Sequence, residues 1–160
     1  MSGDEKLFRN VLGRFATGVC VVSATGQHGL PIGMTINSFS SASLSPSLIQ
    51  WSLKRDALTY ALFADLPQFS ISVLSARQLE VSRRYAKAGD HLLLPDDYAL
   101  SSSGTPYVRG AIAHFECRPW QTYAAGDHDI IVASVERFVS GDPLEPLVFY
   151  EGNYRSLSVV

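Results

Sequence analysis

Apolar and polar positions near the start of the chain follow two periods, one helical and one extended. Five apolar side chains recur at helical spacing over residues 4–15, which predicts an amphipathic helix. They are Leu7, Phe8, Val11, Leu12 and Phe15. The next two runs, 18–24 and 30–36, are rich in β-branched residues and enclose a short Gly-containing turn. They predict a β-hairpin.

The rest of the chain continues this mixture, with strands in the majority. Ser75 and Gln78 form a capping-box pattern, which predicts a helix from there to about Lys87. The stretch 56–65 predicts a second short helix, and the Gly/Pro/Ser-rich stretch 88–106 predicts a long connection. The remaining apolar runs predict strands at 47–53, 69–74, 110–122, 128–140, 146–150 and 153–158.

Many short strands with a few inserted helices favour a mainly β fold, an antiparallel barrel with peripheral helices. The length of 160 residues suits one domain, so we expect residues 1–160 to fold as a single unit. In the run 128–135, Ile130, Val132 and Ser134 should face one side of the sheet, and Ile131, Ala133 and Val135 the other.

Composition and charge remove several classes of function. A net charge of −2 argues against nucleic acid as the main partner. No apolar run approaches the length that spans a bilayer, and the N-terminal stretch lacks a signal-peptide core, so we expect a cytoplasmic protein without membrane contact. Cys20 and Cys117 lie in apolar runs and are expected to be buried free thiols, with a disulfide or metal pair as the alternative.

Common catalytic signatures are missing. The chain has no GxGxxG after its first strand, no GxxxxGK[ST], no HExxH and no GxSxG. His114-Phe115-Glu116 matches the first half of a zinc-deaminase signature, but the PCxxC half is absent. We therefore predict no metal site.

Residues 33–60 carry the most chemical information. Hydroxyl and amide side chains crowd into a segment that lies between two apolar strands, and Gly33 interrupts a strand pattern where a ligand or another backbone can approach closely. Lys54 and Arg55 follow a strand and precede a helix start, which suits an anion. A flavin fits such a segment, with a second cationic cluster at 83–87 for its phosphate. A Ser-rich loop that satisfies its own backbone, and a solvated helix face, remain open as alternatives.

With these stretches in view, the chain resembles the flavin reductase domain family of the FMN-binding split barrel, and more narrowly the short-chain reductase components of two-component flavin-dependent monooxygenases. The matching stretches, in family order and over nearly the whole chain, are FRNVLGRFATGVCVVSA, GLPIGMTINSFSSASLSPSLIQWSL, FSISVLSARQLEVSRRYA, GAIAHFECRPWQTYAAGDHDIIVASV and PLVFYEGNYRSL. The run SLSPS departs from the family's SLDPP-like loop, and LLLP within 88–106 is more apolar than in many relatives. The second departure bears on substrate preference.

The resemblance implies a Greek-key split barrel, a homodimer with one flavin per subunit, and an NAD(P)H:flavin oxidoreductase that supplies reduced FMN or FAD to a separate monooxygenase. His128 would be the catalytic residue beside the nicotinamide, with Asp127 orienting its ring. The cofactor-binding residues carried over from the family are Gly33, Met34, Thr35, Asn37, Ser38, Leu53, Lys54, Thr59, Arg84, Tyr85, Asp127 and Tyr154.

Three alternatives accompany this interpretation. The first is a non-enzymatic FMN-binding electron carrier or redox sensor of the same fold. The second is an oxidase on the same barrel, which needs a second phosphate site with several arginines. The third is a barrel that binds no flavin, in which 33–60 is only a polar loop.

Overall fold

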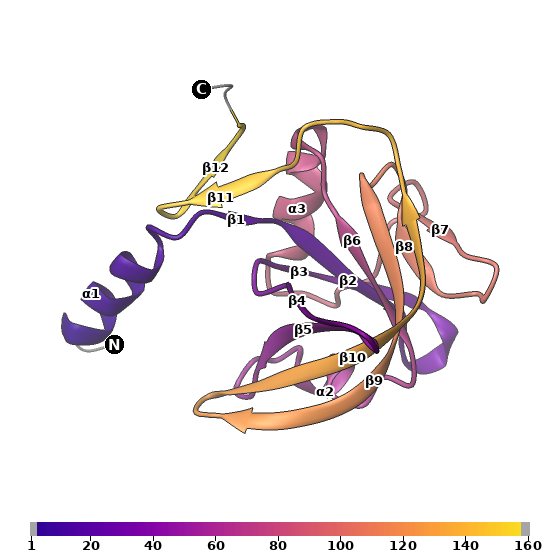
Figure 1. Ribbon diagram of the computed structural model, residues 1–160, viewed down its shortest axis with the longest axis horizontal. Helices are drawn as coiled ribbons and strands as arrows, with labels where there is room; N and C mark the ends of the chain where they lie inside the picture. Colours follow the sequence, from indigo (N-terminus) through magenta and orange to yellow (C-terminus); the bar gives the residue numbers. More distant parts are fainter. Residues whose placement is uncertain (1–2, 158–160) are drawn as a thin grey trace.

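A seven-stranded antiparallel sheet forms the body of the protein in the computed structural model, which describes residues 3–157 (Figure 1). Its strand order is β3-β2-β6-β9-β10-β5-β4, and every neighbouring pair is antiparallel. The strands are β2 (Cys20–Thr25), β3 (Pro31–Ile36), β4 (Ser40–Leu44), β5 (Ser47–Lys54), β6 (Phe69–Val73), β9 (Ala113–Ala125) and β10 (His128–Ser140). The predicted mainly β barrel is confirmed.

The sheet curls around one apolar core because its strands alternate in burial. In β10, Ile131 and Ala133 are buried, whereas Ile130, Val132 and Ser134 are half-buried, as the period of two predicts. The core includes Trp51 and Leu53 of β5 and Phe69 of β6, and each is at most 1% exposed. A second cluster, around Val19, Val21, Leu74, Val108 and Leu147, fills the other face of β2.

Two smaller sheets attach to this barrel. The first contains β1 (Thr17–Gly18), β11 (Val148–Tyr150) and β12 (Asn153–Arg155); we call it the arm sheet. The second is the hairpin of β7 (Tyr98–Leu100) and β8 (Pro106–Val108), and the sequence analysis placed most of it in the long connection 88–106. Buried serines hold β8 in place, because Ser70 donates to the carbonyl of Pro106 and Ser72 accepts from the amide of Val108.

Helices are few and short. They are α1 (Gly3–Leu12), α2 (Tyr60–Phe63) and α3 (Leu79–Tyr85), with single turns η1 (Gln27–Gly29) and η2 (Ala76–Gln78). The predicted capping box is present at Ser75 and Gln78, and η2 leads directly into α3. No helix of the described chain is long and apolar enough to cross a membrane.

Several boundaries differ from the predicted ones. The helix predicted over 56–65 forms only from Tyr60 to Phe63, because the residues before it form a turn against the end of β5. Strand β4 was missed, since its Ser-rich sequence has little β pattern. The predicted strand 110–122 is shifted to Ala113–Ala125. The strand predicted over 153–158 ends at Arg155, and residue 158 lies outside the described residues.

Candidate functional site

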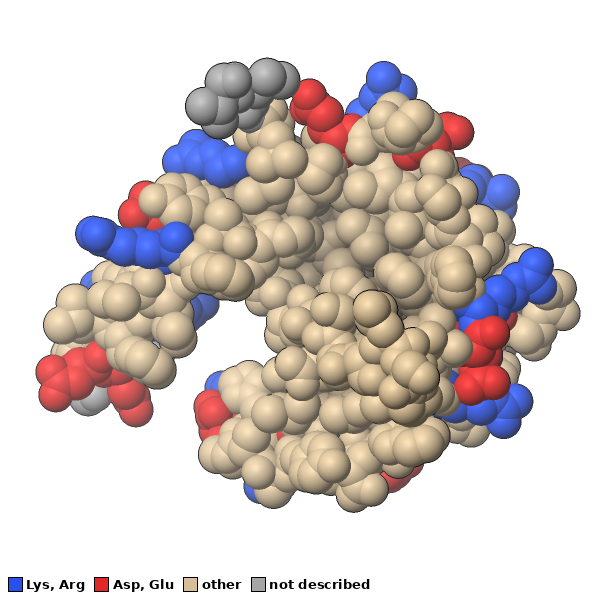
Figure 2. All heavy atoms as spheres, in the orientation of Figure 1, with Lys and Arg blue, Asp and Glu red and all other residues tan. Residues whose placement is uncertain are grey.

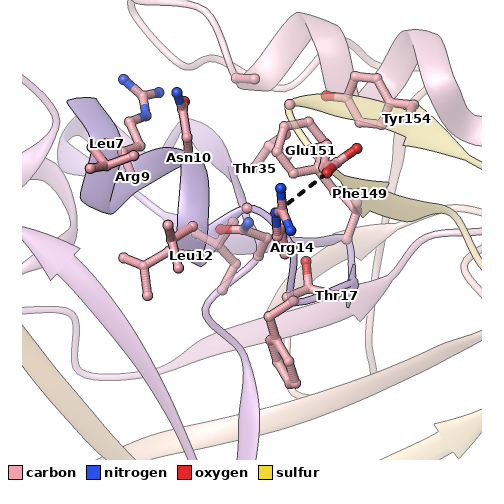
Figure 3. A pocket seen from close by; sticks show the side chains of 18 residues that line it. Leu7, Arg9, Asn10, Leu12, Arg14, Thr17, Thr35, Phe149, Glu151 and Tyr154 are labelled. Atoms are coloured by element: carbon pink, nitrogen blue, oxygen red, sulfur yellow. Dashed lines mark ion pairs between the residues drawn. The ribbon is translucent and has the colours of Figure 1, made fainter.

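A groove of about 860 Å³ opens between α1, the arm sheet and the end of β3. Figure 2 shows a hollow in the molecule between α1 at the left and the β9–β10 hairpin at the bottom. The charged side chains lie mostly around the outer margin of this view. Figure 3 shows polar and aromatic side chains from α1, β3, β11 and β12 converging on this space. Three predicted cofactor-binding residues line it: Thr35, Asn37 and Tyr154.

A chain of hydrogen bonds builds the wall of the groove from three elements. The Thr35 hydroxyl on β3 donates to the backbone carbonyl of Ser82, 2.8 Å away on α3. The Ser82 hydroxyl in turn lies 2.9 Å from the phenol oxygen of Tyr154 on β12. Ser82 is fully buried, and Phe149 packs its ring edge-on against Tyr154. The hydroxyls of Thr35, Ser82 and Tyr154 are therefore all paired within this wall.

Another side of the groove, on α1 and the segment after it, offers cations, and β1 contributes one hydroxyl without a partner in the described part of the chain. Arg14 lies 3.9 Å from Glu151 and is largely exposed, and Arg9 and Asn10 also line the groove (Figure 3). The Thr17 hydroxyl is buried at the groove and has no hydrogen-bond partner among residues 3–157. A buried, unsatisfied hydroxyl at a groove with nearby arginines suits a polar, anionic ligand such as a flavin or a nicotinamide nucleotide.

The turn that carries His128 lies at the tip of the β9–β10 hairpin. Gly126 has φ of +63°, a left-handed conformation that favours glycine at this tight turn. The Nδ1 atom of His128 lies 2.8 Å from a carboxylate oxygen of Asp127, and this contact lowers the pKa of Asp127 below its usual range. In Figure 1 the hairpin tip lies across the opening from α1. His128 thus presents an oriented, part-exposed imidazole, and it is not among the residues that line the groove.

Lys54 sits beside this turn at the end of β5, because it is the register partner of His128. Its ammonium group contacts the carboxylate of Asp56 at 2.9 Å, and this hydrogen bond raises the pKa of Lys54. The charge of Arg9 on α1 lowers this pKa and is the smallest of the effects on it. Lys54 is not among the residues that line the groove, whereas Arg9 is.

Sequence reasoning missed an ionic network around a buried carboxylate next to the turn. The carboxylate of Asp129, 6% exposed, accepts hydrogen bonds from Arg55 and from the phenol of Tyr60. The available signal was an acidic residue at an inward-facing position of β10, directly after the turn.

Other predicted binding residues have partners within the protein. The Ser38 hydroxyl accepts from the backbone amide of Ser52 at 3.0 Å, and this hydrogen bond joins the β3–β4 connection to β5. Leu53 is buried in the core and Met34 packs against this core. Thr59 is buried at the start of α2. These four residues are not among those that line the groove.

Gly33 and the cluster at the end of α3 contact the 88–106 connection. A Cβ at Gly33 would lie 2.5 Å from a methyl carbon of Leu93, so the glycine admits a neighbouring loop at this point. Arg84 and Tyr85 both donate to the carboxylate of Asp97, and Tyr85 also accepts from the amide of Leu94. Neither Arg84 nor Tyr85 lines the groove.

Comparison with known proteins identifies the family. Residues 12–158 match the family model described as "Flavin reductase like domain". The chain is 42% identical over 158 residues to "FMN reductase (NADH) SmoA" of Agrobacterium fabrum, which covers 97% of this chain and 87% of that protein.

Two solved structures have the same fold. The first is the NADH:FAD oxidoreductase SgcE6 of Streptomyces globisporus in complex with NAD and FAD fragments. It is 36% identical with a TM-score of 0.89, over 97% of this chain and 93% of that one. The second is the styrene monooxygenase flavin reductase of Pseudomonas putida S12, which is 32% identical with a TM-score of 0.85, over 96% and 99% of the two chains. The match spans nearly the full length in each case, and this chain therefore belongs to the flavin reductase-like domain family.

Proposed function

We propose that the protein is an NADH-dependent flavin reductase that passes a hydride from NADH to FMN or FAD and supplies the reduced flavin to a separate monooxygenase. The observation that carries the proposal is the groove of about 860 Å³, which Thr35, Asn37 and Tyr154 line together with two cations, Arg9 on α1 and Arg14 after it. Relatives of this chain include reductases named for FMN and for FAD, and both use NADH.

The residues of the chain suit binding and orientation more than acid–base chemistry. When bound, the flavin supplies the hydride acceptor, so the protein needs only to hold two nucleotides with their reacting atoms in contact. Thr35 and Asn37 present a hydroxyl and an amide at the end of β3 for the edge of a flat ring. Arg9 and Arg14 place positive charge at the groove for phosphate groups, and Lys54 adds a cation beside the turn that carries His128.

His128 is the residue we assign to the nicotinamide nucleotide. Asp127 holds its Nδ1 atom at 2.8 Å, so the other ring nitrogen remains for a ligand. With Nδ1–H donated to Asp127, a charged imidazole donates through Nε2 to the carboxamide oxygen or to a phosphate of NADH, whereas a neutral one accepts there from the carboxamide N–H. The remaining binding residues implied by the family, Gly33, Met34, Ser38, Leu53, Thr59, Arg84 and Tyr85, would then support the site from behind the groove wall.

Steady-state NADH oxidation by the purified protein tests the activity. We expect loss of NADH absorbance to depend on added FMN or FAD and to saturate with flavin concentration, since the open groove favours release of the product. A protein that binds flavin but oxidises neither NADH nor NADPH would support the electron-carrier alternative. A protein that binds no flavin would overturn the proposal.

The proposed assembly is a homodimer, formed through the apolar face of α1. In the described chain no side chain of α1 is buried, although Leu7, Phe8, Val11 and Leu12 are between 56% and 66% exposed. Phe15 follows at 78% exposure. An apolar helix face of this size on an arm is typical of a protein–protein contact, and it borders the groove, so a second copy would complete the site.

Charge introduced on this face is expected to separate the subunits. The double substitution Phe8→Asp and Leu12→Asp should shift the mass in solution from two chains to one, because it places carboxylates in a contact that excludes water. Multi-angle light scattering measures the shift. The matched control is Leu100→Asp on β7, which is also exposed and lies at the other end of the molecule (Figure 1). A wild-type monomer at all concentrations would contradict the proposal.

We also propose that the protein works in the cytoplasm. Cys20 and Cys117 are buried free thiols, as the sequence predicted, and both suit a reducing compartment.

A further inference from the structure

Asp129 is a carboxylate at a position where the strand pattern calls for an apolar side chain. It is the second residue of β10 and shares the inward face with Ile131 and Ala133. Only 6% of Asp129 is exposed. A buried carboxylate is unfavourable unless other groups pair with it, so its presence at this point demands a compensating contact.

The compensation comes from one segment, which runs from the end of β5 to the first residue of α2. Nε of Arg55 donates to Oδ1 of Asp129 at 2.8 Å, and a second guanidinium nitrogen donates to the same oxygen at 2.5 Å. The phenol of Tyr60 donates to Oδ2 at 2.6 Å. The hydrogen bond from Arg55, followed by that from Tyr60, lowers the pKa of Asp129, so this carboxylate is charged at neutral pH.

Backbone contacts tie the same segment to the turn that precedes β10. The amide of Arg55 donates to the carbonyl of Asp127 at 3.0 Å. Lys54, immediately before it, is the register partner of His128. Asp129 therefore lies where the segment 54–60 and the turn 126–128 meet, and its two oxygens bond to both ends of that segment.

We propose that Asp129 is a positioning residue for the reductase reaction. Through Arg55 and Tyr60 it holds Lys54 and Thr59, on the flavin side of the proposed site, in one arrangement with His128 on the nicotinamide side. This inference rests on the proposed function. It predicts that breaking the hydrogen bonds of Asp129 weakens the binding of the flavin and of the nicotinamide nucleotide together, because one network positions the contacts for both.

The test compares Asp129→Asn with Glu116→Gln. Glu116 is a matched control, since it is also a carboxylate that is 6% exposed and is hydrogen bonded, by Ser101 and Ser103. It lies near the start of β9, at the other end of the β9–β10 ribbon from the turn. Both substitutions replace a buried charge by an amide, so both are expected to lower thermal stability.

Only Asp129→Asn is expected to change the kinetics of nucleotide use. Its Kd for FMN and its KM for NADH should each rise about tenfold, with a smaller change in kcat, because a displacement of about 1 Å at a positioning contact can cost up to a hundredfold. Arg55→Gln should have the same effect, and the double variant should be no worse than either single one, since all three break one contact. Arg55→Lys should recover part of the loss.

Two further measurements keep the outcome decisive. Tyr60→Phe removes a single hydroxyl and serves if Asp129→Asn does not fold; it should raise both constants in the same direction. Hydrogen exchange of peptides covering 54–60 and 126–129 should be faster in Asp129→Asn and unchanged in Glu116→Gln.

The results separate the two proposals. If wild-type protein oxidises no NADH with any flavin, the proposed function fails, and hydrogen exchange still reports whether Asp129 orders the two segments. If the wild type is active but Asp129→Asn matches Glu116→Gln, with lower stability and unchanged Kd, KM and exchange, the positioning role is overturned.

Discussion

Substitution of His128 by alanine is expected to raise the KM for NADH about ten- to a hundredfold while the Kd for FMN stays unchanged. A hydrogen bond to a charged group contributes about 1.5–3 kcal/mol, which corresponds to that range. The imidazole is part-exposed at the hairpin tip, and Asp127 already fixes one ring nitrogen. The loss should therefore fall on the ligand contact and leave the fold intact.

Steady-state kinetics and flavin fluorescence quenching measure the two constants. The control is His28→Ala, because His28 is also a turn histidine but lies in the connection between β2 and β3, where no site is proposed. An equal rise in both constants for the His128 variant would contradict a role confined to the nicotinamide nucleotide. It would instead resemble the result expected for Asp129→Asn, so the two variants distinguish a direct contact from a positioning network.

The free energy of unfolding is expected to fall as the pH rises above about 9, because buried groups then lose protons on unfolding. Burial raises the pKa of the Cys20 thiol and of the Cys117 thiol from 9.0 to about 12. Burial together with the Asp97 contact raises the pKa of Tyr85 to about 12. Between its unfolded and folded pKa each group keeps its proton only in the folded state, so stability is fully present below about pH 9 and falls as pH rises toward 12.

The expected loss is large. A pH unit across such an interval corresponds to about 1.4 kcal/mol, so each thiol contributes on the order of 4 kcal/mol over the full interval. Together the two thiols contribute an amount comparable to the free energy of unfolding of a whole domain, which is typically about 5–15 kcal/mol. Urea unfolding at a series of pH values from neutral to about 11 measures the decline.

A variant without the two thiols serves as the control for this pH dependence. Cys20→Ala with Cys117→Ala should be less stable than wild type near neutral pH, because both side chains are buried. Its stability should nevertheless fall less steeply above about pH 9, leaving the later contribution of Tyr85. Parallel curves for the two proteins would show that the thiols do not control alkaline unfolding.

Local patterns were sufficient for much of the fold. The alternation in 128–135 placed Ile131 and Ala133 on one face of the strand, and both are buried in the structure. The Ser75–Gln78 pair marked the start of the turn that leads into α3. Such features depend on residues that are near in sequence, so period and capping chemistry predict them. Strand β4 and the β7–β8 hairpin were missed, since short polar strands are set by pairing with distant partners.

The candidate site likewise combines features that the local sequence predicts with features that depend on distant contacts. The stretch 33–60 and the turn at His128 were found from composition and from the family resemblance. The predicted residues nevertheless fall in different surroundings, with Thr35, Asn37 and Tyr154 in the groove and Ser38, Leu53 and Tyr85 held by protein partners. A hydroxyl has the same appearance in a sequence whether it meets a backbone amide or open space, so only the tertiary structure distinguishes the two.

The sequence by itself determined the mainly β architecture, the family, the two buried thiols and the turn with Asp127 and His128. The tertiary structure decided which polar groups are free to bind, because that depends on contacts between residues far apart in the chain. Asp129 illustrates the reason. It lies 74 positions from Arg55 and 69 positions from Tyr60 in the sequence, and it meets them only when β10 pairs with β5. Charge pairing across such separations is a property of the folded sheet register, which no local pattern encodes.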